Sequence, residues 1–154
     1  MEKKIIGVIG SGSADKEQLA LAEAVGRLIA LHGALLICGG LGGVMEAAAR
    51  GANAVGGITI GILPGLDKNS ANPYISVPIA TGLGEIRNAV IVRSSDVLIA
   101  IGGEYGTLSE IAFGLKTGKT VIGIETWDIK GIIKASGAED AVQRALRLTG
   151  KGPE

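Results

Sequence analysis

Cysteine and histidine are almost absent from this sequence of 154 residues, which contains one of each. Because a disulfide needs two cysteines, Cys38 cannot form one within the chain. Structural zinc sites use about four Cys and His ligands. The sequence therefore predicts no metal site, and Cys38 is interpreted as a small core residue.

Aromatic residues, net charge and long apolar runs are also scarce. Aromatic residues make up only 3%, so the core must consist mainly of Ala, Val, Ile and Leu. The 15 basic and 15 acidic residues cancel, and no basic stripe is visible, which argues against a nucleic-acid partner. No apolar run approaches the ~20 residues that span a membrane, and the first segment is typical of a strand and not of a signal peptide. We expect a cytoplasmic protein that does not bind membranes.

Hydrophobic residues nevertheless make up 47% of the chain, with a mean hydropathy of +0.41, which excludes disorder. The length predicts a single domain over residues 1–150, with a short tail over 151–154. Short apolar runs alternate with helical segments. Strands are predicted over 4–9, 34–38, 58–63, 75–79, 96–101 and 120–124, and helices over 16–31, 44–55, 84–93, 107–116 and 138–148.

The predicted strands are mostly continuous apolar runs, which is typical of strands buried on both faces. Together with the intervening helices, they predict an α/β protein with a Rossmann-like, doubly wound parallel sheet in three layers, α/β/α. Asp15 is expected to cap the first helix, which begins at Lys16.

Glycine, with 26 residues, is abundant and clusters after three of the predicted strands. The clusters are Gly10-Ser11-Gly12-Ser13, Gly39-Gly40-Leu41-Gly42-Gly43, and Gly102 to Thr107 with Gly103 and Gly106. Parallel sheets bind ligands outside the carboxyl ends of their strands. Glycine lets backbone N–H groups approach a phosphate, and the following helix N-terminus adds its positive dipole end. A single cluster would favour a simple tight turn, but three at equivalent places predict a phosphate-bearing ligand, most simply a nucleotide.

Two sets of charged side chains have alternative interpretations. Thr107 and Glu110 form a T-x-x-E pattern, which fits either a helix capping box or a carboxylate that faces the phosphate site. Arg87 is either a surface arginine paired with Glu85 or Asp96, or a side chain that binds an anion.

Several of these motifs resemble a known family. GGLGGVMEAAARGA, over residues 39–52, resembles the GGGxxGLM motif of the LOG-type proteins, which are nucleoside 5′-monophosphate phosphoribohydrolases that release cytokinin bases. GGEYGTLSE, over residues 102–110, resembles their PGGxGTxxE motif. The resemblance covers most of the chain in the same order. It implies hydrolysis of the N-glycosidic bond of a purine nucleoside 5′-monophosphate, with Arg87 and Glu110 as the catalytic pair. It also places Met45 in the ligand-binding motif.

The chain departs from that family at three positions of its motifs. Ile101 stands where the family has proline, Glu104 lengthens the loop, and Asn88 stands where the family has a basic residue. The short length and the IGGEYGT form resemble a neighbouring branch that includes the molybdenum cofactor carrier proteins, which hold a pterin phosphate without consuming it. A non-catalytic carrier of such a phosphorylated pterin, or of a nucleotide, is therefore the alternative. No motif indicates a pyridoxal phosphate site or another resident cofactor.

The segment Ile86–Val92 predicts association between copies of the chain. Its sequence, IRNAVIV, is apolar on more than one helical face, whereas a helix packed only on a sheet would bury one stripe. Zero net charge offers little self-repulsion. The resemblance points the same way, since LOG-type proteins pair through helices of this region. We expect a homodimer or a higher homo-oligomer.

Overall fold

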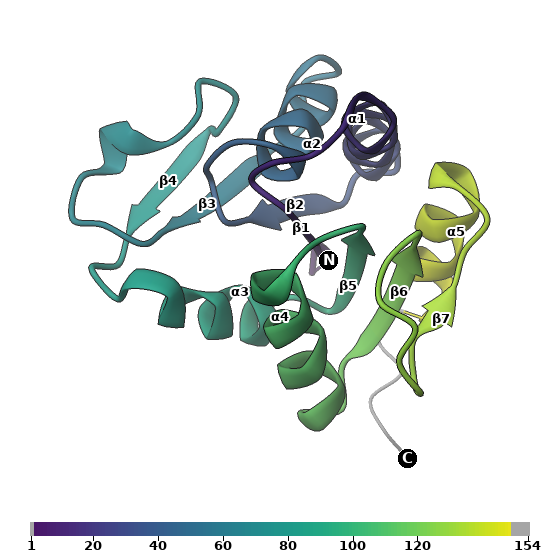
Figure 1. Cartoon of the computed structure of the whole chain (residues 1–154). Coiled ribbons are helices and arrows are strands. Elements are labelled where there is room, and N and C mark those ends of the chain that lie inside the picture. Colours follow the sequence, from purple (N-terminus) through teal and green to yellow (C-terminus); the bar gives the residue numbers. More distant parts are fainter. Residues whose placement is uncertain (1, 149–154) are drawn as a thin grey trace.

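The computed structural model describes residues 2–148 (Figure 1). Seven strands form one sheet in the order β4-β3-β2-β1-β5-β6-β7, and every neighbouring pair is parallel. The strands are β1 (Ile5–Gly10), β2 (Leu35–Cys38), β3 (Thr59–Leu63), β4 (Val77–Ala80), β5 (Val97–Ile101), β6 (Thr120–Ile124) and β7 (Ile133–Lys134). The helices are α1 (Lys16–Leu31), α2 (Val44–Asn53), α3 (Asn88–Ser94), α4 (Tyr105–Lys116) and α5 (Ala138–Leu148), with 3-10 turns η1 (Lys68–Ser70) and η2 (Gly84–Arg87).

Helices cover both faces of the sheet, as Figure 1 shows. Buried apolar residues of α1, α2 and α5 pack on one face, and those of α3 and α4 pack on the other. Every residue of β5 is buried, which matches the continuous apolar run that predicted it. The predicted three-layer, doubly wound α/β fold is therefore confirmed. Among residues 2–148, no helix is both long and apolar enough to cross a membrane.

The central strand β1 divides the sheet into two halves. It pairs with β2 on one side and with β5 on the other, so that Gly10 lies opposite Ile101 at the carboxyl ends. The chain runs outward through β2, β3 and β4, returns to β5, and then runs outward the other way. The segments that follow β1 and β5 lead to helices on opposite faces, which opens a crevice between them.

Most predicted boundaries lie within two residues of the observed ones, and the differences have local causes. The predicted helix over 84–93 is divided into a 3-10 turn, η2, and a shorter α-helix, α3, and its first residue, Gly84, has a φ of +62°, which is not helical. The strand β7 has only two residues and was not predicted. Asp15 caps α1 as expected, accepting a hydrogen bond from the Gln18 backbone N–H at 2.8 Å. The predicted tail over 151–154 lies outside the described residues.

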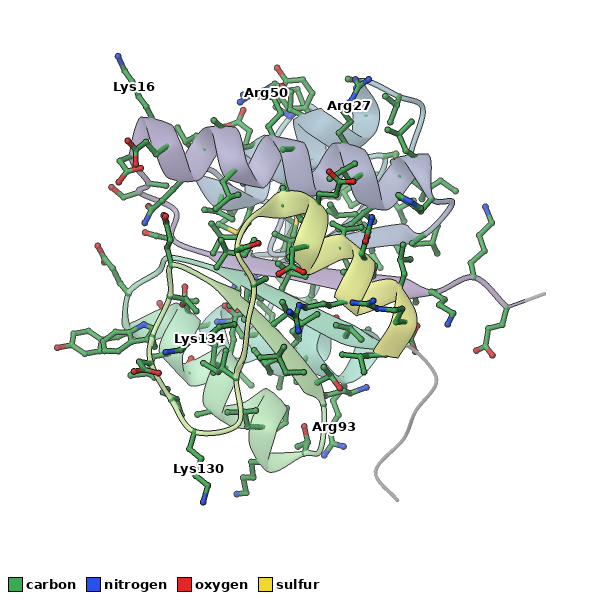
Figure 2. All side chains as sticks on the ribbon, turned by 90° about the vertical axis from the view of Figure 1, so that its right-hand side faces the viewer. Lys16, Arg27, Arg50, Arg93, Lys130 and Lys134 are labelled. Carbon is green, nitrogen blue, oxygen red and sulfur yellow. The ribbon has the colours of Figure 1, made fainter. Side chains whose placement is uncertain are left out.

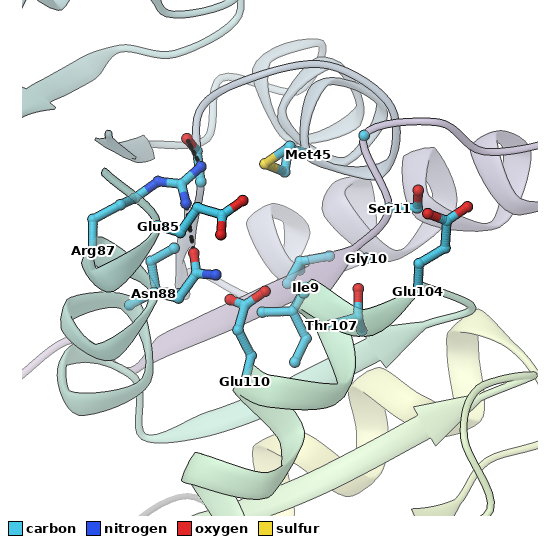
Figure 3. Close-up of a pocket in the computed structure, with 15 residues that line it drawn as sticks. Ile9, Gly10, Ser11, Met45, Glu85, Arg87, Asn88, Glu104, Thr107 and Glu110 are labelled. Atoms are coloured by element: carbon cyan, nitrogen blue, oxygen red, sulfur yellow. Dashed lines mark hydrogen bonds between the residues drawn. The ribbon is translucent and has the colours of Figure 1, made fainter. Parts of the chain in front are cut away.

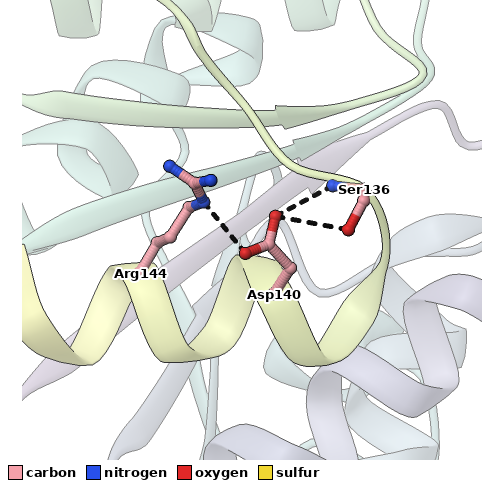
Figure 4. Close-up of polar contacts among 3 residues, drawn as sticks. All are labelled: Ser136, Asp140 and Arg144. Atoms are coloured by element: carbon pink, nitrogen blue, oxygen red, sulfur yellow. Dashed lines mark hydrogen bonds and ion pairs between the residues drawn. The ribbon is translucent and has the colours of Figure 1, made fainter.

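The turn before α5 is held by one carboxylate (Figure 4). Asp140 accepts hydrogen bonds from the Ser136 backbone N–H and from Arg144 Nε, each at 3.0 Å. These two donors hold the pKa of Asp140 below its ordinary value, the Ser136 N–H contributing most. The carboxylate thereby ties β7 to the helix that covers this end of the sheet.

Basic side chains are distributed over several elements. Figure 2 labels six of them on one side of the molecule, and they come from helices on both faces of the sheet and from the segment around β7. No nucleic-acid site is apparent among these labelled residues, and the absence of a nucleic-acid partner stays a prediction.

The helices α1 and α2 are in very close contact. A Cβ atom added to Gly26 of α1 would lie 1.9 Å from the Ala48 carbonyl oxygen, and one added to Gly51 of α2 would lie 2.0 Å from the Glu23 carbonyl oxygen. An ion pair between Arg50 and Glu23, at 3.2 Å, bridges the same two helices. Since α1 and α2 directly follow the glycine clusters after β1 and β2, this contact determines how those two clusters face each other.

We expect Gly26→Ala to destabilise the protein, although alanine favours helix formation. The added methyl group must displace the backbone of α2, an overpacking cost of about 1–3 kcal/mol. Thermal unfolding should show a fall in Tm of about 2–4 °C for each kcal/mol. The matched control is Gly65→Ala, because a Cβ atom there has no neighbour within 4 Å. Equal Tm values for the two variants would contradict the close helix contact.

Candidate functional site

A pocket of about 230 Å³ lies at the carboxyl ends of the strands, in the crevice between β1 and β5 (Figure 3). Its walls come from the loops after β1, β2 and β5, from η2 and α3, and from the first turns of α2 and α4. The lining residues are Val8, Ile9, Gly10, Ser11, Gly12, Gly39, Met45, Glu85, Arg87, Asn88, Ile91, Glu104, Gly106, Thr107 and Glu110.

Many of the residues predicted from the glycine motifs meet in this pocket. They are Gly10, Ser11, Gly12, Gly39, Met45, Gly106 and Thr107, and the pair Arg87 and Glu110 lines it as well. Ser13 and Gly43 instead line a neighbouring cavity beside α1 and α2. The remaining predicted positions, Gly40, Gly42, Gly102 and Gly103, do not line either cavity. A role for these four in ligand binding stays a prediction.

The loop after β1 is held against the N-terminus of α2. The Val44 backbone N–H donates to the Ser11 carbonyl oxygen at 3.0 Å, and Ser11 Oγ accepts from the Ser13 backbone N–H at 3.0 Å. Gly43, with a φ of +65°, is needed here, because a Cβ atom would lie 2.3 Å from the Ser11 carbonyl oxygen. The loop is therefore positioned before any ligand arrives.

The first turn of α4 forms the opposite wall. Thr107 is buried, and Gly106 has no neighbour within 4 Å of the position where a Cβ atom would be. Helix N-termini carry free backbone N–H groups and a positive dipole end, both of which favour a phosphate. Ser11 and Thr107 can add hydroxyl donors to them. This end of the pocket has the chemistry of a phosphate site.

The capping-box interpretation of Thr107 and Glu110 is wrong. The helix α4 begins two residues earlier than predicted, with Glu104 at the N-cap position and no side-chain cap there. Thr107 is therefore the third helical residue, and it cannot cap the helix. Both side chains are instead buried in the wall of the pocket.

Arg87 is buried, with only 7% of its surface exposed, so the surface interpretation of this side chain is also wrong. Its Nη1 donates to Asn88 Oδ1 at 2.6 Å, and its Nη2 donates to the Gly39 carbonyl oxygen at 3.4 Å. The proposed partner Asp96 accepts from the Ile5 backbone N–H instead. Within residues 2–148, Arg87 Nε is a buried donor without a hydrogen-bond partner. Because this nitrogen is closed off from the pocket, the Arg87 groups that can reach a ligand are the second N–H of Nη1 and of Nη2.

Glu110 is a buried carboxyl group on the same wall, 8% exposed. Burial raises its pKa to about 8, and the positive charge of Arg87 offsets part of this rise. Within the described chain the two groups do not form an ion pair. Near neutral pH the Glu110 carboxyl group is therefore mostly protonated, and it can donate a hydrogen bond as well as accept one.

Cys38 lies beneath the pocket at the end of β2 and is fully buried. Burial raises the pKa of its thiol to about 11. The thiol therefore stays protonated at neutral pH and is a poor nucleophile. The interpretation of Cys38 as a small core residue is confirmed.

Sequence reasoning did not assign a site role to three polar residues that line the pocket, Glu85, Asn88 and Glu104. Glu85 and Asn88 flank Arg87 in the sequence, and Glu104 lies within the third glycine cluster. Their proximity to predicted site residues was the available signal. Glu85 lies in the short turn η2, Asn88 begins α3 and Glu104 precedes α4, so no periodic pattern identifies them.

The segment after β6 holds the loop between β5 and α4. Trp127 Nε1 donates to the Glu104 carbonyl oxygen at 3.2 Å, and Thr126 Oγ1 donates to the Gly102 carbonyl oxygen. The Trp127 ring also contacts Tyr105, with ring centroids 6.0 Å apart. The segment after β6 thus holds both the loop and the start of α4.

The fold and the pocket together define a Rossmann-like protein with a small-molecule site at the switch point of its sheet. The chain belongs to the SLOG cluster4 family, whose profile matches residues 3–148. This confirms the LOG-like resemblance seen in the sequence.

Three relatives show how far this similarity extends. An uncharacterized protein of Archaeoglobus fulgidus is 52% identical over 120 residues, which cover 78% of this chain and 79% of the relative. The molybdenum cofactor binding protein of Rippkaea orientalis is 39% identical, with a TM-score of 0.91 over 96% of this chain and 98% of that one. The molybdenum cofactor carrier protein of Chlamydomonas reinhardtii is 35% identical, with a TM-score of 0.87 over 97% and 100% of the two chains.

The raised pKa of Glu110 predicts a pH dependence of stability. Between pH about 4.5 and about 8, the carboxyl group is ionised in the unfolded chain but protonated in the folded one. The free energy of unfolding should therefore fall as pH rises through this window, with a limiting slope of about 1.4 kcal/mol per pH unit from this group. Glu110→Gln should remove that slope in chemical denaturation measurements.

The control is Glu17→Gln, which removes an exposed carboxylate in the first turn of α1. Its stability curve should run parallel to that of the unaltered protein. A Glu110→Gln curve that is also parallel would show that Glu110 ionises normally in the folded state.

Proposed function

We propose that this protein is a non-catalytic carrier of a phosphorylated pterin of the molybdenum cofactor type. The observation that carries the proposal is the pocket with a preformed phosphate end and a buried arginine, Arg87, in its wall. Its support from outside the chain is the similarity, over nearly the whole length, to proteins described as binding or carrying the molybdenum cofactor. The cofactor is the cargo in this proposal and not a resident group.

The phosphate of the ligand lies at the N-terminal turn of α4. Ser11 and Thr107 donate hydroxyl groups, and the absence of a side chain at Gly12 and Gly106 lets the phosphate approach the backbone. Such contacts bind ground-state ligand without requiring any bond to break. Arg87 and Glu110 then face the remainder of the ligand.

A protonated Glu110 is consistent with retention of the ligand. A carboxyl group with a pKa of about 8 is mostly neutral at pH 7, which makes it a weak base and a weak nucleophile. As a neutral acid it donates a hydrogen bond to the ligand and adds no negative charge near the phosphate.

Hydrolysis of a purine nucleoside 5′-monophosphate is the second candidate. The observation in its favour is that Arg87 and Glu110, the positions matching the catalytic pair of LOG-type proteins, line one pocket. A protonated Glu110 would act as the general acid that protonates the leaving base, and Arg87 would orient the substrate.

One experiment separates the two candidates. The protein is incubated with a pterin monophosphate or with AMP and GMP, and then studied by native mass spectrometry and by chromatography for free base. We expect a retained, chemically unchanged ligand and no release of base at high protein concentration. Release of adenine or guanine would establish the hydrolase and refute the carrier.

Gly106→Val should abolish ligand binding while the protein stays folded. The valine side chain has room in the empty protein but occupies the space of the phosphate. We expect a loss of affinity of at least about tenfold in calorimetry, with thermal unfolding near that of the unaltered protein. Undiminished affinity in a folded variant would refute this placement of the phosphate.

The location of the protein in the cytoplasm stays a prediction. We also infer that the protein forms a homo-oligomer. Ile91 and Val92 pack in the core, but Ile86 is 74% exposed and Leu83 is 49% exposed. The edge strand β4 also exposes Val77 and Ile79. Apolar side chains at these positions suit contact with a second copy of the chain.

Sedimentation equilibrium at micromolar concentration should therefore give at least twice the mass of one chain. We expect Ile86→Asp to shift the distribution toward one chain, because it places a charge in the contact. Lys16→Asp, an exposed change on α1, is the control and should leave the mass unchanged. A single-chain mass for the unaltered protein would refute the oligomer.

A further inference from the structure

The pocket is unusually acidic for a phosphate site. Among the described residues that line it, three carry carboxyl groups, Glu85, Glu104 and Glu110, and one, Arg87, is basic. An ionised carboxylate repels phosphate oxygens but accepts hydrogen bonds from donors on a ligand. A carboxylate away from the phosphate end therefore suits a part of the ligand that carries N–H or O–H donors.

The polar and charged side chains are divided between two ends of the pocket. In Figure 3, Ser11, Glu104 and Thr107 lie on one side, and Glu85 and Arg87 lie on the other, beyond Met45. Since the first group surrounds the N-terminus of α4, it marks the phosphate end. The second group, carried by η2, therefore faces the part of the ligand farthest from the phosphate.

Glu110 lies between these two ends. It follows Thr107 by three residues in α4, which corresponds to about 4.5 Å along the helix axis. This places it next to the phosphate end, where the linking portion of a phosphate ester would be. Glu85 comes from a different element on the far wall, and its carboxylate points into the pocket in Figure 3.

We propose that Glu85 and Arg87 together recognise the edge of a 2-amino-4-oxo pyrimidine ring, the ring that guanine and pterins share. This edge presents an amino group, a ring N–H and a carbonyl oxygen in a row. The two oxygens of Glu85 accept from the amino group and the ring N–H. Arg87 donates to the carbonyl oxygen through the second N–H of an Nη nitrogen, which neither Asn88 nor Gly39 uses. The inference rests on the proposed function and names the ligand class of the same site.

The rest of the pocket suits a flat ring. Ile9, Met45 and Ile91 contribute apolar side chains to its wall, and a polarisable methionine sulfur packs favourably against aromatic rings. Arg87 is also held in place, since Asn88 Oδ1 and the Gly39 carbonyl oxygen accept from its other two nitrogens. The second N–H of each Nη nitrogen is therefore positioned in advance.

The same chemistry discriminates against related rings. Adenine has a ring nitrogen acceptor where guanine has an N–H. This acceptor would face the Glu85 carboxylate with no proton to share. Hypoxanthine lacks the amino group and loses one of the two hydrogen bonds. Sites that pair a ligand donor reject analogues that lack it, because a protein group is then left unpaired.

Calorimetry with four monophosphates tests the inference, namely neopterin monophosphate, GMP, IMP and AMP. The unaltered protein should bind neopterin monophosphate or GMP at least about tenfold more tightly than IMP and AMP. Glu85→Gln should remove this preference, because an amide presents only one acceptor. It should leave the weak affinity for AMP unchanged or slightly raised.

The matched control is Glu17→Gln, which removes one exposed negative charge away from the pocket and should preserve the full preference. The inference is supported if the protein prefers neopterin monophosphate, with or without GMP, and if Glu85→Gln abolishes that preference. Which of the two ligands is preferred then shows whether the ring is that of a pterin or of either class. Equal binding of all four ligands overturns it while leaving the phosphate site intact.

Two further outcomes also overturn the inference. If Glu85→Gln weakens AMP and GMP equally, Glu85 binds a sugar hydroxyl and not the ring. If none of the four monophosphates binds, the proposed carrier function fails together with the inference. If they bind without preference, only the recognition of the ring fails.

Discussion

The hydrogen bonding of β1 to both β2 and β5 is the constraint on which the rest of the structure depends. It places β1 at the centre of the sheet. The helices that follow β1 and β2 then cover one face, and those that lead into and out of β5 cover the other. The loops that leave β1 and β5 then diverge, and the space between them becomes the pocket. The residues on its wall come from segments separated by about a hundred positions in the sequence, from Val8 to Glu110.

The pocket keeps two ionisable groups in a buried setting. Arg87 and Glu110 each lose most of their hydration, and burial shifts the pKa of each toward its neutral form. Glu110 has no ion-pair partner among residues 2–148, and one donor of Arg87 has no acceptor. Such groups reduce stability in the empty protein, so their presence at one site is typical of a place where a ligand supplies the missing partners.

Much of the fold could be predicted from the sequence, because strong local signals agree with the final packing. The run DVLIAI predicted a strand buried on both faces, and β5 is one. Asp15 marked the start of α1, and its carboxylate accepts the expected local hydrogen bond, from the Gln18 backbone N–H. The two-residue strand β7 carries no periodic signal, and it depends on pairing with β6.

The site was harder to predict than the fold. The glycine clusters could be assigned to one edge because parallel strands end there, and nine of the residues suggested as site residues line the same pocket. The burial of Arg87 could not be predicted, since it depends on the 3-10 turn η2 and on contact with Gly39, 48 positions away. The capping-box pattern was misleading because α4 starts two residues early, which puts Thr107 at the third position of the helix.

The contact between Trp127 and that loop has a practical consequence. This indole is the single tryptophan of the chain, and it is bonded to the carbonyl group of Glu104, a residue of the pocket wall. Trp127 itself lines a different cavity, so a ligand beside α4 can act on the indole only through Glu104. Its fluorescence is therefore the natural signal in which to look for a change on binding, without a label.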